Sequence, residues 1–327
     1  MNVLITGGAG FVGRHFCGYL LHSGHGVDVV DSIVPYTGGM DPTEKGWPLF
    51  DPRDFDKFRF VKQDCRDFFR MNPHAEYDIV IHLAAMVGGR EMIEQNPLSV
   101  AEDLAIDSDF WNWAKIAKPG HTLCFSSSAA YPVDLQKPGQ YRLLKESDIA
   151  FKGMIGMPDM SYGWAKLTHE YLAQIAFEKY GLTSTVFRPF SGYGEDQDMA
   201  YPFPSIVKRA IENRGAECIT VWGTGDQMRD FIHISDCVRI AWSAKDMIRD
   251  GRAINLSTGI LTSFKQFAKL TSNKLGYDPE VVGTSNKPEG VFARGGCTEF
   301  QESLGLRYSI SFEQGVEQAI EYLRGRK

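Results

Sequence analysis

Two side chains able to move a proton stand four residues apart in the sequence, Tyr162 and Lys166. The apolar spacing of residues 161–180 predicts a helix, and positions i and i+4 of a helix project from the same face. A cation close to a tyrosine favours the phenolate and lowers the pKa of the phenol, which turns the side chain into a general base for a hydroxyl proton. Such pairs also occur on ordinary helix surfaces, so this pair alone leaves both interpretations open.

Three consecutive serines follow the apolar stretch 122–125, which reads as a buried strand. Parallel α/β sheets bind their ligands at the carboxyl ends of their strands, which is where Ser126, Ser127 and Ser128 are expected. A serine hydroxyl there could share a substrate proton with Tyr162.

A glycine-rich segment, residues 6–13 (TGGAGFVG), separates an apolar strand at 3–5 from helical spacing at 11–21. Glycines in this position let a pyrophosphate approach backbone N–H groups at a helix N-terminus. Asp31 ends the next strand, 27–30, where a carboxylate can accept both ribose hydroxyls of a bound adenosine. The carboxylate would repel a 2′-phosphate, so the sequence favours NAD over NADP.

Asp64 follows the third expected strand, 58–61, with Cys65 beside it. Its carboxylate could accept a hydrogen bond from the adenine amine. A strand-end aspartate that caps the next turn is the alternative interpretation.

The elements that must position these residues alternate between strand and helix, which is typical of a doubly wound parallel sheet. We therefore expect an α/β protein with a Rossmann-type sheet and a smaller C-terminal substrate-binding cap domain. The expected domains interleave: 1–188 plus about 230–258 for NAD, and about 189–229 plus 259–327 for substrate. Residues 36–55 form a long loop that is expected to be functional or mobile. The further expected strands are 77–82, 183–187, 219–222 and 231–234, and the further helices are 98–117, 205–214, one within 263–275 and 311–324.

Composition narrows the class of protein. The 327 residues carry a formal net charge of −6, so the chain lacks the broad cationic face that nucleic-acid binding requires. No apolar run reaches the ~20 residues of a membrane span, and the first residues do not resemble a secretory signal, so a cytoplasmic location is expected. The six cysteines are scattered without metal-ligand spacing, which predicts free thiols and no metal site.

Taken in order, these motifs resemble those of the extended short-chain dehydrogenase/reductases of the nucleotide-sugar epimerase and dehydratase group. The resemblance implies a catalytic triad of Ser127, Tyr162 and Lys166, with Lys166 also holding the nicotinamide ribose. It implies a nucleoside diphosphate sugar as substrate and a homodimer formed through a four-helix bundle. The residues that it assigns to NAD are Gly7, Gly10, Phe11, Val12, Gly13, Asp31, Asp64, Cys65, Leu83, Ala84, Ala85, Tyr162 and Lys166.

The residue at position 129 indicates which of the reactions found in this group the chain catalyses. The 4,6-dehydratases of the group place Asp-Glu directly after the triad hydroxyl and the decarboxylases place a Glu nearby, whereas this chain has Ser128-Ala129. Segments 84–89 and 127–132 are similar to GDP-mannose 3,5-epimerase and GDP-fucose synthase, but their acid/base cysteine is also replaced by Ala129. Epimerisation at C4 through a transient ketosugar needs only the triad and NAD, so it is the simplest reaction for a chain that lacks these acid/base residues. The alternatives are a 4-ketosugar reductase, a 3,5-epimerase-like enzyme, and a non-catalytic NAD-binding sensor or scaffold.

Four residues are expected to contact the substrate. By resemblance Arg229 binds its phosphates, although an ion pair with a neighbouring aspartate is the alternative. Ser191 stands where the family has an asparagine, and Ser128 lies beside the triad serine. Arg90, after a glycine pair, could bind a sugar carboxylate or phosphate, or else be a solvated loop residue.

Overall fold

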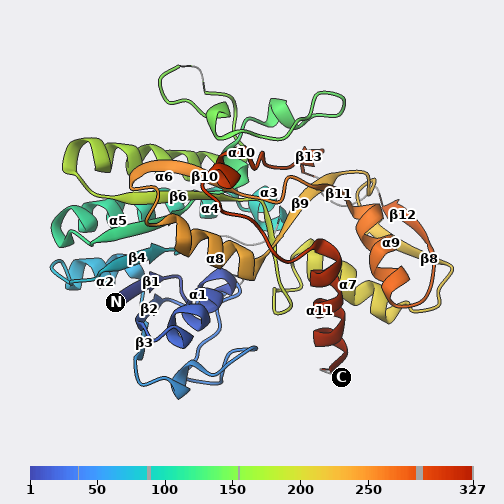
Figure 1. Ribbon diagram of the computed structural model, residues 1–327, viewed down its shortest axis with the longest axis horizontal. Helices are drawn as coiled ribbons and strands as arrows, with labels where there is room; N and C mark the ends of the chain where they lie inside the picture. Colours follow the sequence, from blue (N-terminus) through green and yellow to red (C-terminus); the bar gives the residue numbers. More distant parts are fainter. Residues whose placement is uncertain (36, 87–89, 154, 285–289, 326–327) are drawn as a thin grey trace.

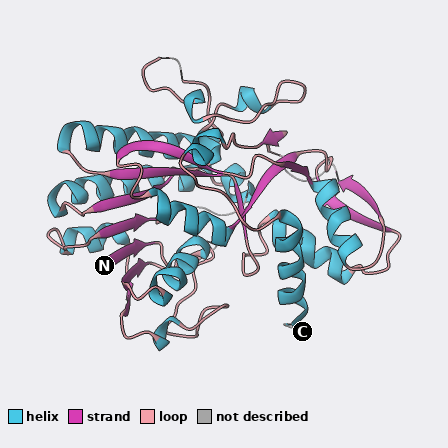
Figure 2. Ribbon diagram, viewed as in Figure 1, coloured by secondary structure: helices cyan, strands magenta, loops and turns pink. Residues whose placement is uncertain are grey.

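A seven-stranded parallel sheet forms the larger part of the protein, and its strands lie one above another at the left of Figures 1 and 2. The computed structural model describes residues 1–327 except 36, 87–89, 154, 285–289 and 326–327. The strand order is β10-β6-β5-β4-β1-β2-β3. Its strands are β1 (Asn2–Thr6), β2 (Gly26–Asp31), β3 (Phe58–Lys62), β4 (Ile79–His82), β5 (His121–Phe125), β6 (Ser184–Pro189) and β10 (Asp250–Leu256).

Helices cover both faces of this sheet, which is why its central strands are rich in apolar residues. Val3, Leu4 and Ile5 of β1 are at most 1% exposed. One face packs against α1 (Phe11–His22) and α8 (Ile234–Ala244). The other face packs against α2 (Cys65–Met71), α5 (Asp103–Ala117) and α6 (Met160–Tyr180), and two short helices, α3 (Arg90–Gln95) and α4 (Pro97–Val100), precede α5.

The sheet reverses its direction of winding between β1 and β4. From β1 the chain proceeds outward through β2 to β3, and it then returns to the other side of β1 to place β4, β5 and β6. Loops at such a switch point diverge and leave a crevice at the carboxyl ends of the strands. The glycine-rich segment and the serines after β5 both lie at this edge.

A smaller unit stands beside the sheet, at the right of Figure 1. Its sheet joins β11 (Leu261–Ser263), β9 (Met228–His233) and β13 (Ala293–Arg294), with β7 (Ser191–Tyr193) also paired to β9, while β8 (Cys218–Trp222) pairs with β12 (Glu280–Thr284). Aromatic rings in mutual contact, including Phe203, Phe231 and Phe312, fill its core. Its helices are α7 (Pro202–Glu212), α9 (Phe264–Lys274) and α11 (Phe312–Gly325), and a short helix, α10 (Glu299–Ser303), precedes α11.

The structure differs from the sequence expectations in several places. The helix expected at 98–117 is divided into α4 and α5, and strand β4 begins only at Ile79. Strand β10 was not expected, although it completes the main sheet. The described part of loop 36–55 is anchored to the core, because Trp47 is 4% exposed and its indole N–H donates to the carbonyl of Met40 over 2.9 Å.

The domain bounds stay a prediction. Segment 230–258 is divided in the structure, since α8 and β10 pack on the main sheet whereas β9 belongs to the smaller one. Among the described helices none has the length and apolar character needed to cross a bilayer.

Candidate active site

The glycine-rich turn between β1 and α1 is closely packed against the loop that follows β4. Gly7 has φ +69, and a Cβ there would lie 2.7 Å from the backbone nitrogen of Ala84. Only glycine fits both this conformation and this approach. Phe11, Val12 and Gly13, whose N–H groups form the free first turn of α1, line the adjoining cavity. This turn fits the pyrophosphate of a dinucleotide.

Asp31 lies at the end of β2 beside that turn. Its carboxylate accepts hydrogen bonds from the backbone N–H of Ala9 (3.0 Å) and of Ile33 (2.8 Å), which fix its orientation toward the cavity that it lines. Burial raises the pKa of Asp31, while the two N–H groups and the nearby Arg14 oppose that rise. The carboxylate oxygens keep further lone pairs for ribose hydroxyls, so the residues present fit NAD.

Asp64 and Cys65 lie at the start of α2 on the same cavity. Asp64 caps α2 by accepting from the backbone N–H of Arg66 (2.8 Å), and it forms an ion pair with the Arg66 guanidinium at 2.6 Å. The alternative role considered for Asp64, a helix cap, is therefore present. A contact with adenine stays a prediction.

The expected triad converges on one side of the cavity. Ser127 precedes a short 3₁₀ turn (Ser128–Ala130), and its Oγ accepts from the backbone N–H of Ala129 over 3.1 Å. Helix α6 lies directly on this turn, because a Cβ at Gly163 would fall 2.4 Å from the carbonyl oxygen of Ala129. This close approach brings Tyr162, on the first turn of α6, to the serine.

Lys166 lies one turn after Tyr162, with its Nζ 5.7 Å from the centre of the phenol ring. Contrary to the expectation from the sequence, the pKa of Tyr162 is above its usual value. Burial raises it most, Lys166 and the Ser127 hydroxyl lower it, and Asp103 raises it further. The contribution of Lys166 therefore has the expected sign, but burial and a carboxylate outweigh it.

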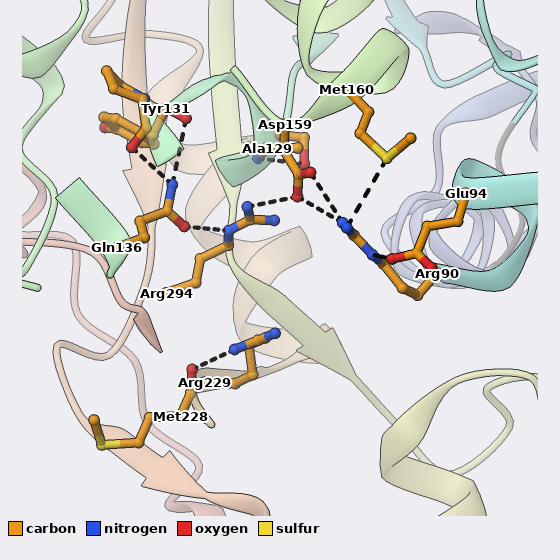
Figure 3. A network of polar contacts seen from close by, with 12 residues as sticks. Arg90, Glu94, Ala129, Tyr131, Gln136, Asp159, Met160, Met228, Arg229 and Arg294 are labelled. Carbon is orange, nitrogen blue, oxygen red and sulfur yellow. Dashed lines mark hydrogen bonds and ion pairs between the residues drawn. The ribbon is translucent and has the colours of Figure 1, made fainter. Parts of the chain in front are cut away.

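A network of charged side chains contributes to the wall of the same cavity (Figure 3). Asp159, directly before α6, accepts from Arg90 Nη1 and from Arg294 Nη2, each at 2.8 Å. Arg90 also donates to Glu94 over 2.6 Å, and Arg294 Nε donates to Gln136 over 2.7 Å. Asp159 thus connects the start of α3 to strand β13 of the smaller unit.

Arg229, on β9 opposite Arg294, points toward the same space. Its Nη1 donates to the carbonyl of Met228 (2.7 Å), and its guanidinium lies 5.7 Å from the ring centre of Phe264. Burial, together with the positive charges of Arg294 and Arg90, lowers the pKa of Arg229 to about 9. A buried cation crowded by other cations favours an anionic ligand, which agrees with a phosphate contact.

The expected NAD residues and the triad line one cavity of about 1240 Å³, which Leu83, Ala84, Ala85 and Gly10 near the glycine turn also line. Ser128 and Ser191 also line it, as do Arg90 and Arg229. The structure therefore brings every expected site residue to one place, although the substrate contacts stay predictions. Residues 87–89, which belong to a segment quoted for the resemblance, lie outside the described residues.

Sequence reasoning missed four residues of this site. Asp103 and Asp107 are charged positions one turn apart on an otherwise apolar helix face, a signal that could have found them. Asp159 stands at the cap position just before α6, which is also a readable signal. No local pattern distinguishes Arg294.

Comparison with known proteins gives matches over the whole chain. Residues 3–257 match the NAD dependent epimerase/dehydratase family. The probable UDP-glucuronate 4-epimerase of Rhizobium meliloti (strain 1021) is 29% identical, over 98% of this chain and 96% of its own. The UDP-N-acetyl-alpha-D-glucosaminuronate decarboxylase of Bacillus cytotoxicus is 26% identical, over 98% and 97%.

Among solved structures, the UDP-glucose 4-epimerase of Thermotoga maritima, determined with UDP-glucose, superposes with a TM-score of 0.84. It is 24% identical and the match covers 100% of this chain and 99% of that one. This likeness confirms the expected fold, a Rossmann-type sheet with a smaller cap.

Proposed function

This chain belongs to the NAD-dependent epimerase/dehydratase family, and on that premise we propose that it epimerises a nucleoside diphosphate sugar through a transient ketosugar, most simply at C4. Its cofactor is NAD, which when bound takes a hydride from a sugar carbon and returns it. Since the chain is an enzyme of this family, the alternative of a non-catalytic sensor or scaffold is set aside.

Tyr162 is the proposed acid/base. Its phenolate would take the proton of a sugar hydroxyl as that carbon is oxidised, and its phenol would return a proton to the oxygen on reduction. The Ser127 hydroxyl would orient the sugar oxygen between the two side chains. Lys166 supplies the positive charge that stabilises the phenolate. Inversion requires the ketosugar to turn over in the site before it is reduced.

The observation that carries this proposal is the identity of residue 129, two positions after the triad serine. By resemblance the dehydratase branch has an acid there, whereas this chain has Ala129. The neighbouring carboxylate, Asp159, is already paired with two arginines. Burial raises the pKa of Asp159, but Arg294 and Arg90 outweigh burial and hold it below its usual value. An ionised Asp159 cannot protonate a leaving hydroxyl, which favours epimerisation over dehydration.

A 4-ketosugar reductase is the second candidate. Its tyrosine acts as a proton donor, and the raised pKa of Tyr162 keeps the phenol in its donating form. A 3,5-epimerase would need an acid/base on each face of the sugar, and Ala129 provides neither.

The substrate would lie with its diphosphate near Arg229 and Arg294. Both arginines are partly buried and line the same cavity, and guanidinium groups bind phosphates bidentately. Uridine diphosphate sugars stand in the names of the relatives reported above, so we propose them as the first class to assay.

The test is a panel of UDP-, GDP-, dTDP- and CDP-sugars given to the purified protein without added NAD(P)H, with products identified by NMR in deuterated water. We expect interconversion of C4 epimers without deuterium in the product. Turnover that consumes added NADPH would show a reductase instead. Deuterium at C3 or C5 would show the double epimerase.

We also propose a homodimer built on α5 and α6. Large apolar side chains are exposed along both helices, among them Leu104 (40%), Trp164 (43%) and Tyr171 (47%). These side chains form an apolar stripe along each helix, and a second pair of helices could cover the two stripes. The cytoplasmic location expected from the sequence stays a prediction.

A further inference from the structure

A buried set of charged side chains lies between α5 and α6, directly behind Tyr162. Helix α5 contributes Asp103 and Asp107, one turn apart, and α6 contributes Lys166 and His169. Each of the four is 5% exposed or less. Because residues three or four apart share a helix face, the two pairs oppose each other across the contact between the helices.

The set divides into two contacts. His169 Nδ1 lies 3.0 Å from Asp107 Oδ1, and His82 Nε2 of β4 lies 3.2 Å from the same oxygen. Lys166 Nζ lies 3.6 Å from Asp103 Oδ2. Asp107 therefore contacts the two histidines, whereas Asp103 contacts Lys166.

Asp103 is held in place for this contact. Its Oδ1 accepts from the backbone N–H of Met86 over 2.5 Å. Its Oδ2 has no hydrogen bond within the described part of the chain and is buried, so the ammonium of Lys166 is the cation that it faces. A carboxylate removed from water in this way is strongly coupled to its partner.

Lys166 is thus shared between a phenol and a carboxylate. An ammonium beside Tyr162 alone would stabilise the phenolate, but a carboxylate on the other side of the ammonium cancels part of that field. We infer that Asp103 is a positioning residue that holds Lys166 and offsets its charge, so that Tyr162 keeps its proton while the site awaits substrate. The inference rests on the role of Tyr162 in the proposed function.

The groups that face Tyr162 agree with this balance. Lys166 on its own helix and the Ser127 hydroxyl lower its pKa, whereas Asp103 and Asp107 of α5 raise it. Tyr201, before α7, is also coupled to Tyr162 and has a raised pKa of its own, mainly through burial. Burial would lower the pKa of Lys166, but Asp103 and the other anionic groups outweigh burial and raise it. The lysine is therefore a permanent cation whose effect on the phenol depends on Asp103.

The experiment is an ultraviolet titration of tyrosinate in the NAD-loaded protein without sugar, with the titration of Y162F subtracted to isolate residue 162. In Asp103→Asn, which keeps the acceptor for Met86 but loses the charge, we expect the pKa of Tyr162 to fall by about one unit. The rising limb of turnover against pH should move to lower pH with it. Asp103→Glu, which restores the charge, should return both toward wild type.

Asp109→Asn is the matched control, because Asp109 lies on the same helix but pairs with Arg70 at the surface. It should leave both readouts unchanged. A folded D103N with the wild-type Tyr162 pKa would overturn the inference, and so would a D103E that shifts as far as D103N. If D103N does not fold, Asp103→Ser gives the same neutral test.

The titration needs no substrate, so it does not depend on which sugar is turned over. An active Y162F would overturn the proposed function, whereas an unshifted phenol in D103N would overturn only the role of Asp103.

Discussion

Arg188 of β6 and Glu170 of α6 form a buried ion pair with Nη2 and Oε2 2.6 Å apart, both side chains at most 3% exposed. The same carboxylate accepts from the hydroxyl of Ser126, and Arg188 Nη1 donates to the hydroxyl of Tyr131 over 3.0 Å. The pair therefore fixes both ends of the segment that carries Ser127. It is structural support for the site, beneath the residues that contact the cavity.

Replacing Arg188 by methionine should lower the free energy of unfolding by about 3 to 5 kcal/mol, because it leaves Glu170 charged, buried and unpaired. Urea unfolding at pH 7 measures this loss. In the double variant with Glu170→Met as well, no charge is left uncompensated, and a large part of the stability should return. Equal losses in the single and double variants would contradict this account of the pair.

Tyr162→Phe should reduce turnover by a factor of about 10² to 10⁴, since it removes the proposed acid/base group. Bound NAD, measured from the absorbance of the denatured supernatant, should stay near the wild-type level. Tyr180→Phe, an exposed tyrosine at the end of the same helix, is the matched control and should keep full activity. Turnover by Y162F at the rate of wild type would exclude Tyr162 as the base.

Gly7→Ala should both destabilise the protein, by about 1 kcal/mol or more, and reduce the NAD retained on purification. The reason is a Cβ placed 2.7 Å from the backbone of Ala84 at φ +69. Gly24→Ala separates the two effects, because Gly24 has φ +80 but no atom within 4 Å of the added Cβ. The G24A protein should be less stable than the wild type but should retain as much NAD. A G7A protein that retains the full amount of NAD would contradict the prediction.

The stability of the fold should depend on pH through His121 of β5. This residue is 1% exposed, and its ring nitrogens lie 3.0 Å from the Thr183 hydroxyl and 2.9 Å from the Thr185 hydroxyl. Burial and Arg249 lower its pKa from 6.5 to about 4. Because the unfolded chain binds the proton first, the contribution to stability is complete above pH 6.5 and is lost as the pH falls toward 4.

The loss across that interval should be about 2 to 3 kcal/mol. Unfolding free energies of the wild type and of His121→Gln, measured from pH 7 to pH 4, isolate it as the difference in slope. Parallel curves for the two proteins would assign the pH dependence to other groups.

The proposed homodimer is tested by Leu104→Glu with Trp164→Glu, which place charge on the exposed faces of α5 and α6. We expect light scattering to give a mass near 73 kDa, twice the 36.6 kDa of the chain, for the wild type, and a monomer for the variant. Met71→Glu, also an exposed apolar position at 73%, is the control and should stay dimeric. A monomeric wild type would refute the interface.

The sequence was most informative where periodicity and local motifs coincide. The unit β1-α1-β2, the glycine turn and the helix that bears Tyr162 and Lys166 were all predictable, because each is determined by residues close together in the chain. Strand β10 was not predictable, since its DGRAINL sequence contains glycine, aspartate and arginine and depends on pairing with β6. The break between α4 and α5 was not predictable either, because neither Ala101 nor Glu102 is a proline or glycine that would indicate the end of a helix.

Within the site, the sequence predicted which residues take part in the reaction, but not which neighbours shift their pKa values or hold them in place. That Lys166 would lower the pKa of Tyr162 follows from their spacing. That Asp103 opposes it depends on how α5 packs against α6, and that Asp159 joins Arg90 to Arg294 depends on the position of β13. These contacts join residues 63 to 135 positions apart in the sequence, where no local pattern connects them.

Strand β10 also constrains how the molecule can be assembled during synthesis. It pairs with β6, yet β7, α7, β8, β9 and α8 are translated between them. During synthesis, β6 therefore emerges from the ribosome well before β10, and its outer edge is unpaired in the meantime. Backbone groups on that edge can join strands of another nascent molecule until residue 256 has emerged, so a chaperone that shields open strand edges would be of most use in that interval.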